Sequence, residues 1–571
     1  METLSRPTRT AKPQRTSSTP PPSPKKSGKL VGPRAFKLLW DTHSVTGIII
    51  GLGLFIIFYA GAFALYRAEL HAWADPALRA SETRLTADEV IAPFFAEAPP
   101  SPGTDVQITY PYHERSYYYV RYQTPEGDTT RVVQALVNAE TGASFDVPVG
   151  ETLGRSALSE LLYRLHFFYQ AGFWGQLIAG LVAVFFLLTV VSGVLIHLRK
   201  LPKDWHTFRP KVKLRSALAD AHTVLGLIGL PFAAMYAITG AFLALLVILL
   251  APTVIVVFGG DQEAAFNLVY DLKMPEHEPT GVPAEMLSFA EYEAALPDSW
   301  GDGTVETTLI IVHGYGDENA IADVYGDATN TITAAPRAIL KGSTAELLVA
   351  NNPTKATPLG GTTSAITNLH YARLGTWAPL AKVLYFLLAL ATAAVILTGN
   401  ILWVLVRRPK DPRATPKLHR FLARLTIGVG CGLVLAVPIL FLTTQLLPID
   451  MDGLKTWENR VFFGVWAALL AAAFAGPTAI WAARWQLWAA GVLSLLVPLA
   501  SGALGGTWPW IAASNGWWGI LTIDVGFVLM GLALLWTARR LRPDALTLAP
   551  SGDGDGAAIA APLAPHPAVS S

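Results

Sequence analysis

The chain has 571 residues, of which 52% are hydrophobic and only 15% are charged. Soluble domains usually carry about 25% charged residues, so this deficit indicates a membrane protein. The single cysteine, Cys431, excludes an internal disulfide, a metal site built from several cysteines and the two-cysteine motif that attaches a c-type haem. The formal net charge of +1 points to no class of partner, and nucleic acid is not expected as one.

Long apolar runs divide the chain. A helix needs about 20 apolar residues to cross a bilayer, and this length predicts about eight spans. The last four are the least regular because Pro438, Pro477 and Pro498 interrupt them, although membrane helices tolerate such prolines. The predicted spans are Val45–Tyr66, Gly175–Ile196, Thr223–Leu250, Pro379–Leu405, Leu425–Leu447, Val461–Ala483, Leu487–Leu504 and Ile520–Thr537.

The spans define the predicted domains. A disordered basic arm (1–35) and the first span (36–66) precede a first loop domain (67–165). The second and third spans (166–250) follow, joined by a basic loop, and then come a second loop domain (251–368) and the fourth span (369–410). Four further spans (411–542) and a disordered tail (543–571) complete the chain. The basic arm before a long apolar run indicates an uncleaved anchor rather than a signal peptide.

Basic residues fix the expected orientation. They gather at 25–37, 199–215, 407–420 and 539–542, which all fall on one side if the spans alternate. Because cytoplasmic loops are enriched in Lys and Arg, both termini are expected in the cytoplasm of a bacterium, with the protein in its inner membrane. The two loop domains then lie outside. His206, in the basic inner loop, is expected to contact anionic lipid headgroups.

Both outside segments have strand patterns, at Ser116–Tyr122, Arg131–Val137 and Ala143–Val147 in the first and at Thr307–Val312 and Ala320–Tyr325 in the second. Each is expected to form a small α+β domain, with a hairpin turn at Asn138–Gly142 in the first. Neither segment shows a nucleophile motif or metal-ligand spacing. The histidines there are interpreted as isolated surface residues: His71, His113, His277 and His313.

The strongest signal is an internal duplication. The first span contains His43, Gly47 and Gly61, and the third contains His222, Gly226 and Gly240 at the same spacing. The second and fourth spans repeat a Leu-His pair (Leu165-His166 and Leu369-His370), a Gly-x-Trp and a Ser/Thr-Gly (Ser192-Gly193 and Thr398-Gly399) in the same order. The first four spans are therefore predicted to be two helical hairpins that form a four-helix bundle, with small residues at close helix contacts.

The duplication places histidines at matching depths. His43 and His222 lie at the inner face, and His166 and His370 at the outer face. Ionisable residues at the membrane edge usually face a bundle interior, and two histidines on facing helices suit a haem iron. We therefore expect non-covalent haem b, held by His43 with His222 and by His166 with His370. His197 is a reserve inner ligand, although its repeat position is Trp403, which cannot ligate. Hydrogen-bonded interfacial histidines, a proton relay or another metal remain alternatives.

These motifs resemble the PepSY-associated transmembrane helix family. The stretch Ser192–His197, with Thr207–Pro210 and Asp220-Ala-His222, is similar to its iron-regulated branch, which includes siderophore reductases. The resemblance covers residues 35–410, with the last four spans as an extension, and it implies b-type haem ligated by His43, His166, His222 and His370. The segment Ser116–Val147 resembles a degenerate PepSY unit.

The expected function is transmembrane electron transfer that reduces a ferric chelate outside the membrane. Because no Gly-x-Gly-x-x-Gly follows a predicted strand, a separate donor is expected, either a quinol in the bilayer or a cytoplasmic reductase. Two other functions stay open: a peptide-binding or regulatory membrane protein without redox activity, and a transporter for iron complexes. Catalytic residues in the strict sense are not identified.

Overall fold

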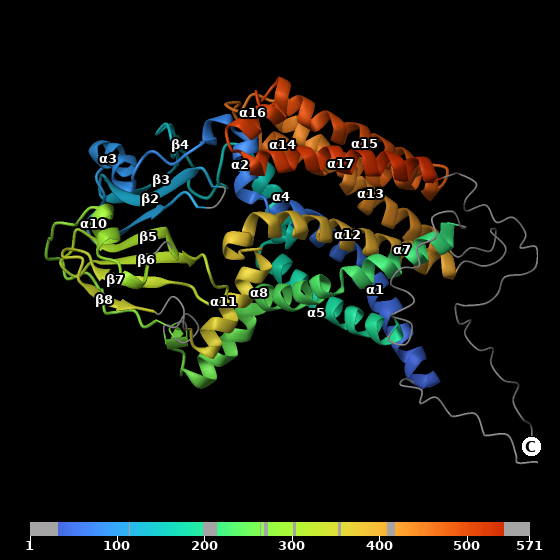
Figure 1. Ribbon diagram of the computed structural model, residues 1–571, viewed down its shortest axis with the longest axis horizontal. Coiled ribbons are helices and arrows are strands. Elements are labelled where there is room, and N and C mark those ends of the chain that lie inside the picture. Colours follow the sequence, from blue (N-terminus) through green and yellow to red (C-terminus); the bar gives the residue numbers. More distant parts are fainter. Residues whose placement is uncertain are drawn as a thin grey trace, which may run out of the picture.

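A computed structural model describes residues 32–541 except 113–114, 198–213, 263, 266, 268–271, 301–303, 352–355 and 408–416. The basic inner loop with His206, the predicted tail, His113 and nearly all of the predicted arm lie outside the described residues. Figure 1 shows long helices that run side by side, with a sheet at one end. Seven described helices are long and apolar enough to cross a membrane, or eight if one bent pair counts as a span, so this is a multi-pass membrane protein.

The first helix group holds the duplicated sequence. It consists of α1 (Pro33–Ala64), α5 (Gly172–His197), α7 (Leu214–Ile228), α8 (Leu230–Val257) and α12 (Ala378–Val406). Contacts close the group into a ring, because α1 packs on α5 and α12, α5 on α8, and α7 on α12. The predicted third span is not one straight helix, since α7 and α8 meet at Gly229 with a bend of 68°.

The C-terminal helix group consists of α13 (Lys417–Leu446), α14 (Leu454–Ala475), α15 (Ala479–Ala503) and α17 (Trp518–Arg540), with the short α16 (Pro509–Ser514). The predicted sixth span, Val461–Ala483, is wrong in its boundaries. Its helix ends at Ala475, and Gly476 and Pro477 lie in the turn before α15, because Pro477 ends a helix rather than bending it. Pro438 and Pro498, by contrast, lie inside helices as expected.

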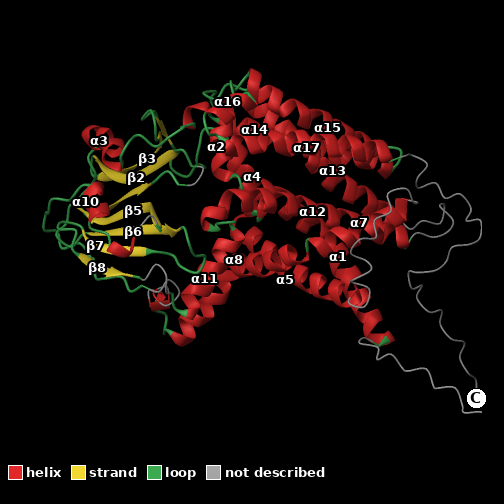
Figure 2. Ribbon diagram, in the orientation of Figure 1, coloured by secondary structure: helices red, strands yellow, loops and turns green. Residues whose placement is uncertain are grey.

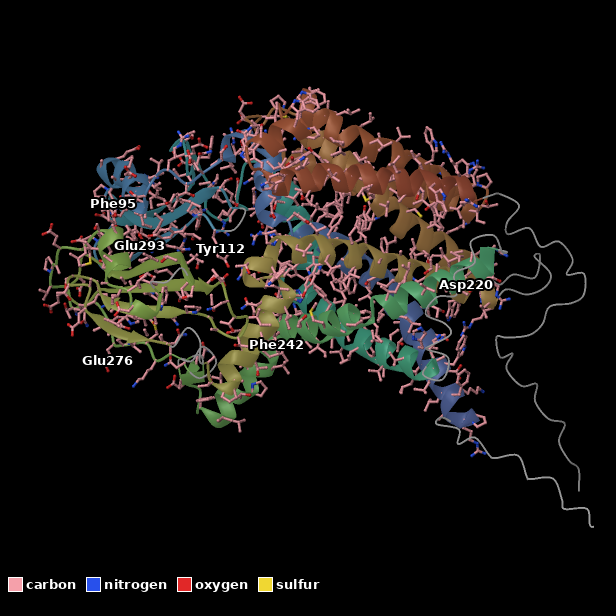
Figure 3. All side chains as sticks on the ribbon, in the orientation of Figure 1. Phe95, Tyr112, Asp220, Phe242, Glu276 and Glu293 are labelled. Carbon is pink, nitrogen blue, oxygen red and sulfur yellow. The ribbon has the colours of Figure 1, made fainter. Side chains whose placement is uncertain are left out.

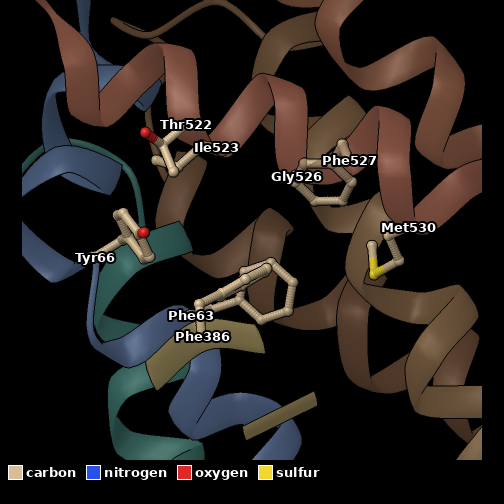
Figure 4. Close-up of a pocket in the computed structure, with 8 residues that line it drawn as sticks. All are labelled: Phe63, Tyr66, Phe386, Thr522, Ile523, Gly526, Phe527 and Met530. Carbon is tan, nitrogen blue, oxygen red and sulfur yellow. The ribbon is translucent and has the colours of Figure 1, made fainter. Parts of the chain in front are cut away.

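The two helix groups pack closely where they meet. Figure 4 shows a small apolar pocket there, between α1, α12 and α17, lined by Phe63, Tyr66, Phe386, Thr522, Ile523, Gly526, Phe527 and Met530. Its volume of about 20 Å³ is room for roughly one water molecule. The pocket is therefore too small for a substrate.

The strands of both loop segments, 67–165 and 251–368, form one sheet, shown in yellow in Figure 2. The first segment gives β1 (Thr104–Thr109), β2 (Tyr117–Glu126), β3 (Thr129–Asn138) and β4 (Ser144–Asp146), and the second gives β5 (Val305–Tyr315), β6 (Ile321–Ala328), β7 (Arg337–Lys341) and β8 (Leu347–Ala350). The order is β4-β3-β2-β1-β5-β6-β7-β8, all antiparallel. The sequence predicts two separate domains, whereas the pairing of β1 with β5 joins them. The fold is mostly helical, as expected, with this eight-stranded sheet added.

Each half of the sheet contributes a capped helix to a shared core. Thr86 and Glu89 form a capping box at the start of α3 (Ala87–Glu97), and Ser288 and Glu291 form one at the start of α10 (Phe289–Ala294). Asp88 of α3 then accepts hydrogen bonds from the first backbone N–H groups of α10. Both helices pack on the same apolar cluster as the central strands, so the two halves fold as one unit.

Buried polar contacts fix the base of the sheet on the C-terminal helix group. Glu458 of α14 accepts hydrogen bonds from Ser156 Oγ, the Ala157 N–H and Thr444 Oγ1, and it is fully buried. Arg79 donates to carbonyl groups on both sides of the junction, including Ala72 O and Gly505 O at 2.8 Å each. These contacts anchor the segments before β1 and after β4 to the C-terminal helix group.

Exposed tryptophans mark the sheet-side ends of the helices. Trp174, Trp377, Trp457, Trp510 and Trp518 are 47–69% exposed and lie at or beside the first turn of α5, α12, α14, α16 and α17. Tryptophan is enriched where a membrane meets water. These side chains place a membrane interface between the helices and the sheet.

Candidate functional site: two histidine pairs

One histidine pair lies far from the sheet. His43 of α1 and His222 of α7 have ring centroids 6.2 Å apart, with the ring planes 77° from each other. Each ring is held by a carbonyl group of a neighbouring span: His43 Nδ1 bonds Thr189 O and His222 Nδ1 bonds Val395 O, both at 2.9 Å. Thr189 and Val395 occupy matching positions in the duplication, each four residues before the repeated glycine.

The second pair lies near the sheet. His166 and His370 have ring centroids 6.1 Å apart. They lie just before the second and fourth spans, as the sequence predicts, where they end two short helices, α4 (Leu158–His166) and α11 (Pro358–His370), that precede α5 and α12. His166 Nδ1 bonds Ile57 O at 2.7 Å, whereas His370 Nδ1 bonds the Thr239 hydroxyl at 3.0 Å.

These hydrogen bonds fix which nitrogen of each ring carries the proton. A carbonyl oxygen only accepts, so Nδ1 of His43, His166 and His222 must be the donor. The partner of His370 is a hydroxyl, and Thr239 can accept from His370 Nδ1 while it donates to Met235 O. In the described part of the chain, Nε2 of these four rings has no hydrogen-bond partner. A neutral imidazole with a bonded Nδ1–H and an open Nε2 is the form that binds a metal.

The repeated glycines lie against the histidine rings. A methyl group at Gly193 would sit 3.1 Å from His43 Cε1, and one at Gly399 would sit 2.9 Å from His222 Cε1. At Gly61 it would sit 2.5 Å from His166 Nδ1, whereas at Gly240 it would be 3.8 Å from His370 Cε1. At Gly61, Gly193 and Gly399, the side chain of any larger residue would therefore overlap the histidine ring. The other repeated glycine of the first span, Gly47, has no neighbour within 4 Å, so not every glycine serves a close contact.

The two pairs occupy different depths. His43 and Ile57, which bonds the outer pair, are 14 residues apart on α1, which corresponds to about 20 Å at 1.5 Å per residue. Between these depths, Phe186, Phe232 and Tyr385 of α5, α8 and α12 form one aromatic cluster with Phe58, which follows Ile57 on α1. This cluster reaches the outer pair through Tyr236, whose ring is 5.0 Å from that of His370.

The remaining membrane histidines take different positions. His197 is the last residue of α5 and is close enough to interact electrostatically with both His43 and His222, so it lies beside the inner pair without replacing either member. His419 stacks on Trp403, the residue that takes the place of His197 in the second repeat, with ring centroids 5.4 Å apart. Neither residue forms part of a ring pair like the two above.

The histidines of the sheet region are not isolated surface residues, so that interpretation is wrong for the three that the structure describes. His71 is buried, which lowers its pKa, while its contact with Glu160 at 3.4 Å acts in the opposite direction. His277 and His313 have ring centroids 5.5 Å apart. His313 also bridges Asp105 at 3.1 Å and Asp323 at 3.6 Å. Sequence reasoning missed these contacts because they join strands far apart in the chain.

A family model for the PepSY-associated TM region matches residues 40–405. The chain belongs to this family. The match contains both histidine pairs and the whole sheet, and it ends before the C-terminal helix group. An uncharacterized protein of Pseudomonas aeruginosa is 29% identical to this PepSY-associated membrane protein over 390 residues, which are 66% of this chain and 93% of the relative.

Proposed function

We propose that this protein is a b-type haem protein that transfers electrons across a bacterial inner membrane. One haem would lie between His43 and His222 and the other between His166 and His370. The observation that carries the proposal is the presence of two histidine pairs at two depths of one helix group, each with facing rings about 6 Å apart.

The residues of each pair fit this group in two respects. Two imidazoles on opposite sides of one iron, with Fe–N bonds of about 2 Å and a ring radius of about 1.1 Å, have centroids about 6 Å apart. The observed separations are 6.2 and 6.1 Å. In addition, the Nδ1 bonds keep each ring oriented and direct the lone pair to Nε2, which is the usual arrangement around a metal-ligating histidine.

Bound haem would supply a one-electron Fe(III)/Fe(II) couple at each depth. The chain's own part is to hold the rings at a fixed depth by the bonds to Thr189, Val395, Ile57 and Thr239, and to exclude water with the aromatic cluster between the pairs. The positive-inside pattern supports an orientation in which both termini and the inner pair lie at the cytoplasmic face. The outer pair and the sheet then face the other side.

The acceptor would be a ferric chelate such as a ferric siderophore. Hard oxygen ligands bind Fe(III) more strongly than Fe(II) because of its higher charge, so reduction releases the metal for uptake. The donor would be a separate molecule, either a quinol in the bilayer or a cytoplasmic reductase. These assignments follow the resemblance to the siderophore-reductase branch and the two-depth arrangement of the histidines.

The test is a dithionite-minus-oxidised spectrum of the purified full-length protein with a haem count. We expect two haems, both extracted by acid–acetone because the single cysteine precludes a two-cysteine attachment. His222→Ala should remove or convert one haem and spare the other, and His43→Ala should affect that same haem. Colourless protein from haem-replete cells would refute the proposal and favour a peptide-binding or regulatory role.

The ligand pairs can be separated from the reserve ligand in the same way. His166→Ala and His370→Ala should act on the other haem, and His197→Ala should leave both haems in place. If His43→Ala and His370→Ala abolish the same haem, the pairing is wrong. Dithionite-reduced protein, freed of excess reductant, should be reoxidised by ferric siderophores, with an Fe(II) trap reporting the product. If the haems stay reduced across a panel of ferric chelates, the reductase assignment is refuted, whereas the haem assignment is not.

A further inference from the structure

The loops that follow the two outer histidines are built alike. α4 ends at His166 and α11 ends at His370, and in each loop the residue two positions later has a left-handed backbone, Phe168 with φ 58° and Ala372 with φ 56°. This turn reverses the chain into the next span. The left-handed residues themselves pack inward, because Ala372 is buried and the Phe168 ring lies against Gly53 of α1.

Aromatic side chains connect each outer histidine to the protein surface. The ring of Tyr371 lies 5.5 Å from that of His370 and is 39% exposed. On the other loop, the ring of Phe167 lies 6.5 Å from His166 and 5.2 Å from Tyr169, which is 41% exposed. Tyr163 of α4 lies beside both loops, because its ring is 5.2 Å from that of Phe167 and its hydroxyl interacts with that of Tyr371. Both members of the outer pair therefore reach the same surface region through one or two rings.

An arginine covers each of the two exposed tyrosines. The Arg164 guanidinium carbon is 5.7 Å from the centre of the Tyr169 ring, and that of Arg373 is 5.2 Å from the Tyr371 ring. Among the described residues, neither arginine forms an ion pair with a carboxylate. Arg67, which covers Tyr163 at 4.2 Å, differs because Glu160 neutralises it at 2.5 Å. Arg164 and Arg373 therefore have no direct carboxylate partner in the described part of the chain, although Tyr112 lies between Arg373 and Asp327.

The sheet borders this region. The Thr376 N–H donates to Thr329 O at the end of β6, so the loop with Arg373 contacts the sheet directly. Tyr112, labelled in Figure 3 where the sheet faces the helices, donates its hydroxyl to Asp327 and lies near Arg373. Asp327 and Glu306 are acidic groups near Tyr112, and the Tyr112 hydroxyl donates a hydrogen bond to Asp327.

We infer that Tyr169, Tyr371, Arg164 and Arg373 form the docking site of an anionic metal chelate with planar aromatic or carboxylate ligand groups. Guanidinium groups bind such oxygen anions, and the exposed tyrosine rings provide flat contact surfaces for the chelating arms. A chelate held here is one or two rings from the outer histidines. The role of this site in electron transfer rests on the proposed function, whereas binding of the chelate requires no haem.

The test separates binding from electron transfer by using a metal that is not reduced. Gallium(III) has the charge and size of Fe(III), so its tris-catecholate complex (charge −3) and its neutral tris-hydroxamate complex are matched probes. Each is titrated calorimetrically into the full-length protein in zwitterionic nanodiscs. Arg164→Gln combined with Arg373→Gln should weaken the tris-catecholate about tenfold, the loss expected for two exposed charge contacts. The neutral complex should bind both proteins alike.

Two controls keep the test decisive. Arg164→Lys with Arg373→Lys retains the charge and should restore most of the affinity, which a misfolded protein would not do. Arg460→Gln removes an exposed arginine that covers Trp457 at 5.7 Å outside this region, and it should have no effect. Equal affinities for the charged and neutral complexes, or an equal loss in Arg460→Gln, would overturn the inference. So would loss of tris-catecholate binding in anionic nanodiscs at matched salt, because lipid phosphate would then be the natural ligand of these arginines.

Discussion

The contact between Gly61 and His166 allows the site to be tested by adding one methyl group. In Gly61→Ala the new Cβ would lie 2.5 Å from His166 Nδ1 and 2.7 Å from Cε1, closer than nonbonded atoms approach. At the equivalent position of the duplication, Gly240→Ala would place its Cβ 3.8 Å from His370 Cε1, which is an ordinary contact. The same substitution is therefore expected to have opposite effects in the two repeats.

The size of the difference follows from the geometry. The His166 ring must move by about 1 Å to reach a normal contact, and such overpacking costs about 1–3 kcal/mol. The movement also breaks the 2.7 Å bond to Ile57 O, a loss of about 1 kcal/mol. Gly240→Ala has neither cost, and the gain of up to about 1 kcal/mol from the better helix propensity of alanine applies to both helical positions and cancels from the difference. We expect the variants to differ by roughly 2–4 kcal/mol.

The assay is thermal unfolding of both variants in the same detergent, together with the reduced-minus-oxidised spectrum of each. Gly61→Ala should unfold at a lower temperature and, if the haem proposal holds, alter the outer haem alone. Gly240→Ala should match or exceed the wild type in stability and keep its spectrum. Equal stability of the two variants would refute the placement of His166 against Gly61, whatever cofactor is present.

Two other contacts and the membrane orientation give tests of their own. Glu458→Gln replaces one carboxylate oxygen, which accepts from buried donors, by an amide N–H, and it should lower the free energy of unfolding by about 1–3 kcal/mol. Proteolysis near residue 150 should then occur earlier than in the wild type. The control Glu151→Gln changes an exposed residue and should leave the stability unchanged. Burial opposes charge on His313, but its bonds to Asp105 and Asp323 prevail and raise its pKa to about 9. Since this exceeds the unfolded value of about 6.5, the stability it adds should be complete below pH 6.5 and lost as the pH rises through 9. Because Asp105 is half exposed, the free energy of unfolding of wild type should exceed that of His313→Gln by only about 1–2 kcal/mol at pH 6.5. The same difference at pH 10 would contradict this explanation. Finally, periplasmic reporters fused after residues 130 and 320 should be active and one after residue 212 silent, and activity at 212 would reverse the proposed orientation.

The sequence alone predicted the features that depend on composition and local pattern. Apolar length found the helices, because a bilayer demands it, and alternation found β2, β3, β5 and β6 within a few residues. The duplication placed four histidines at two depths without any contact information, since equal spacing on equivalent helices gives equal height. It also drew attention to the glycines at 61, 193, 240 and 399.

Tertiary structure decided what depends on contacts between distant residues. The pairing of β1 with β5 merges two apparent domains, and no local pattern records which edge of one segment meets the other. The acceptors of the histidine Nδ1 groups, such as Thr189 O and Val395 O, are backbone atoms of neighbouring spans that side-chain identity does not specify. Ring separation, tautomer and the contact of Gly61 with His166 all follow from how the helices pack, and packing is set by the whole chain rather than by any one segment.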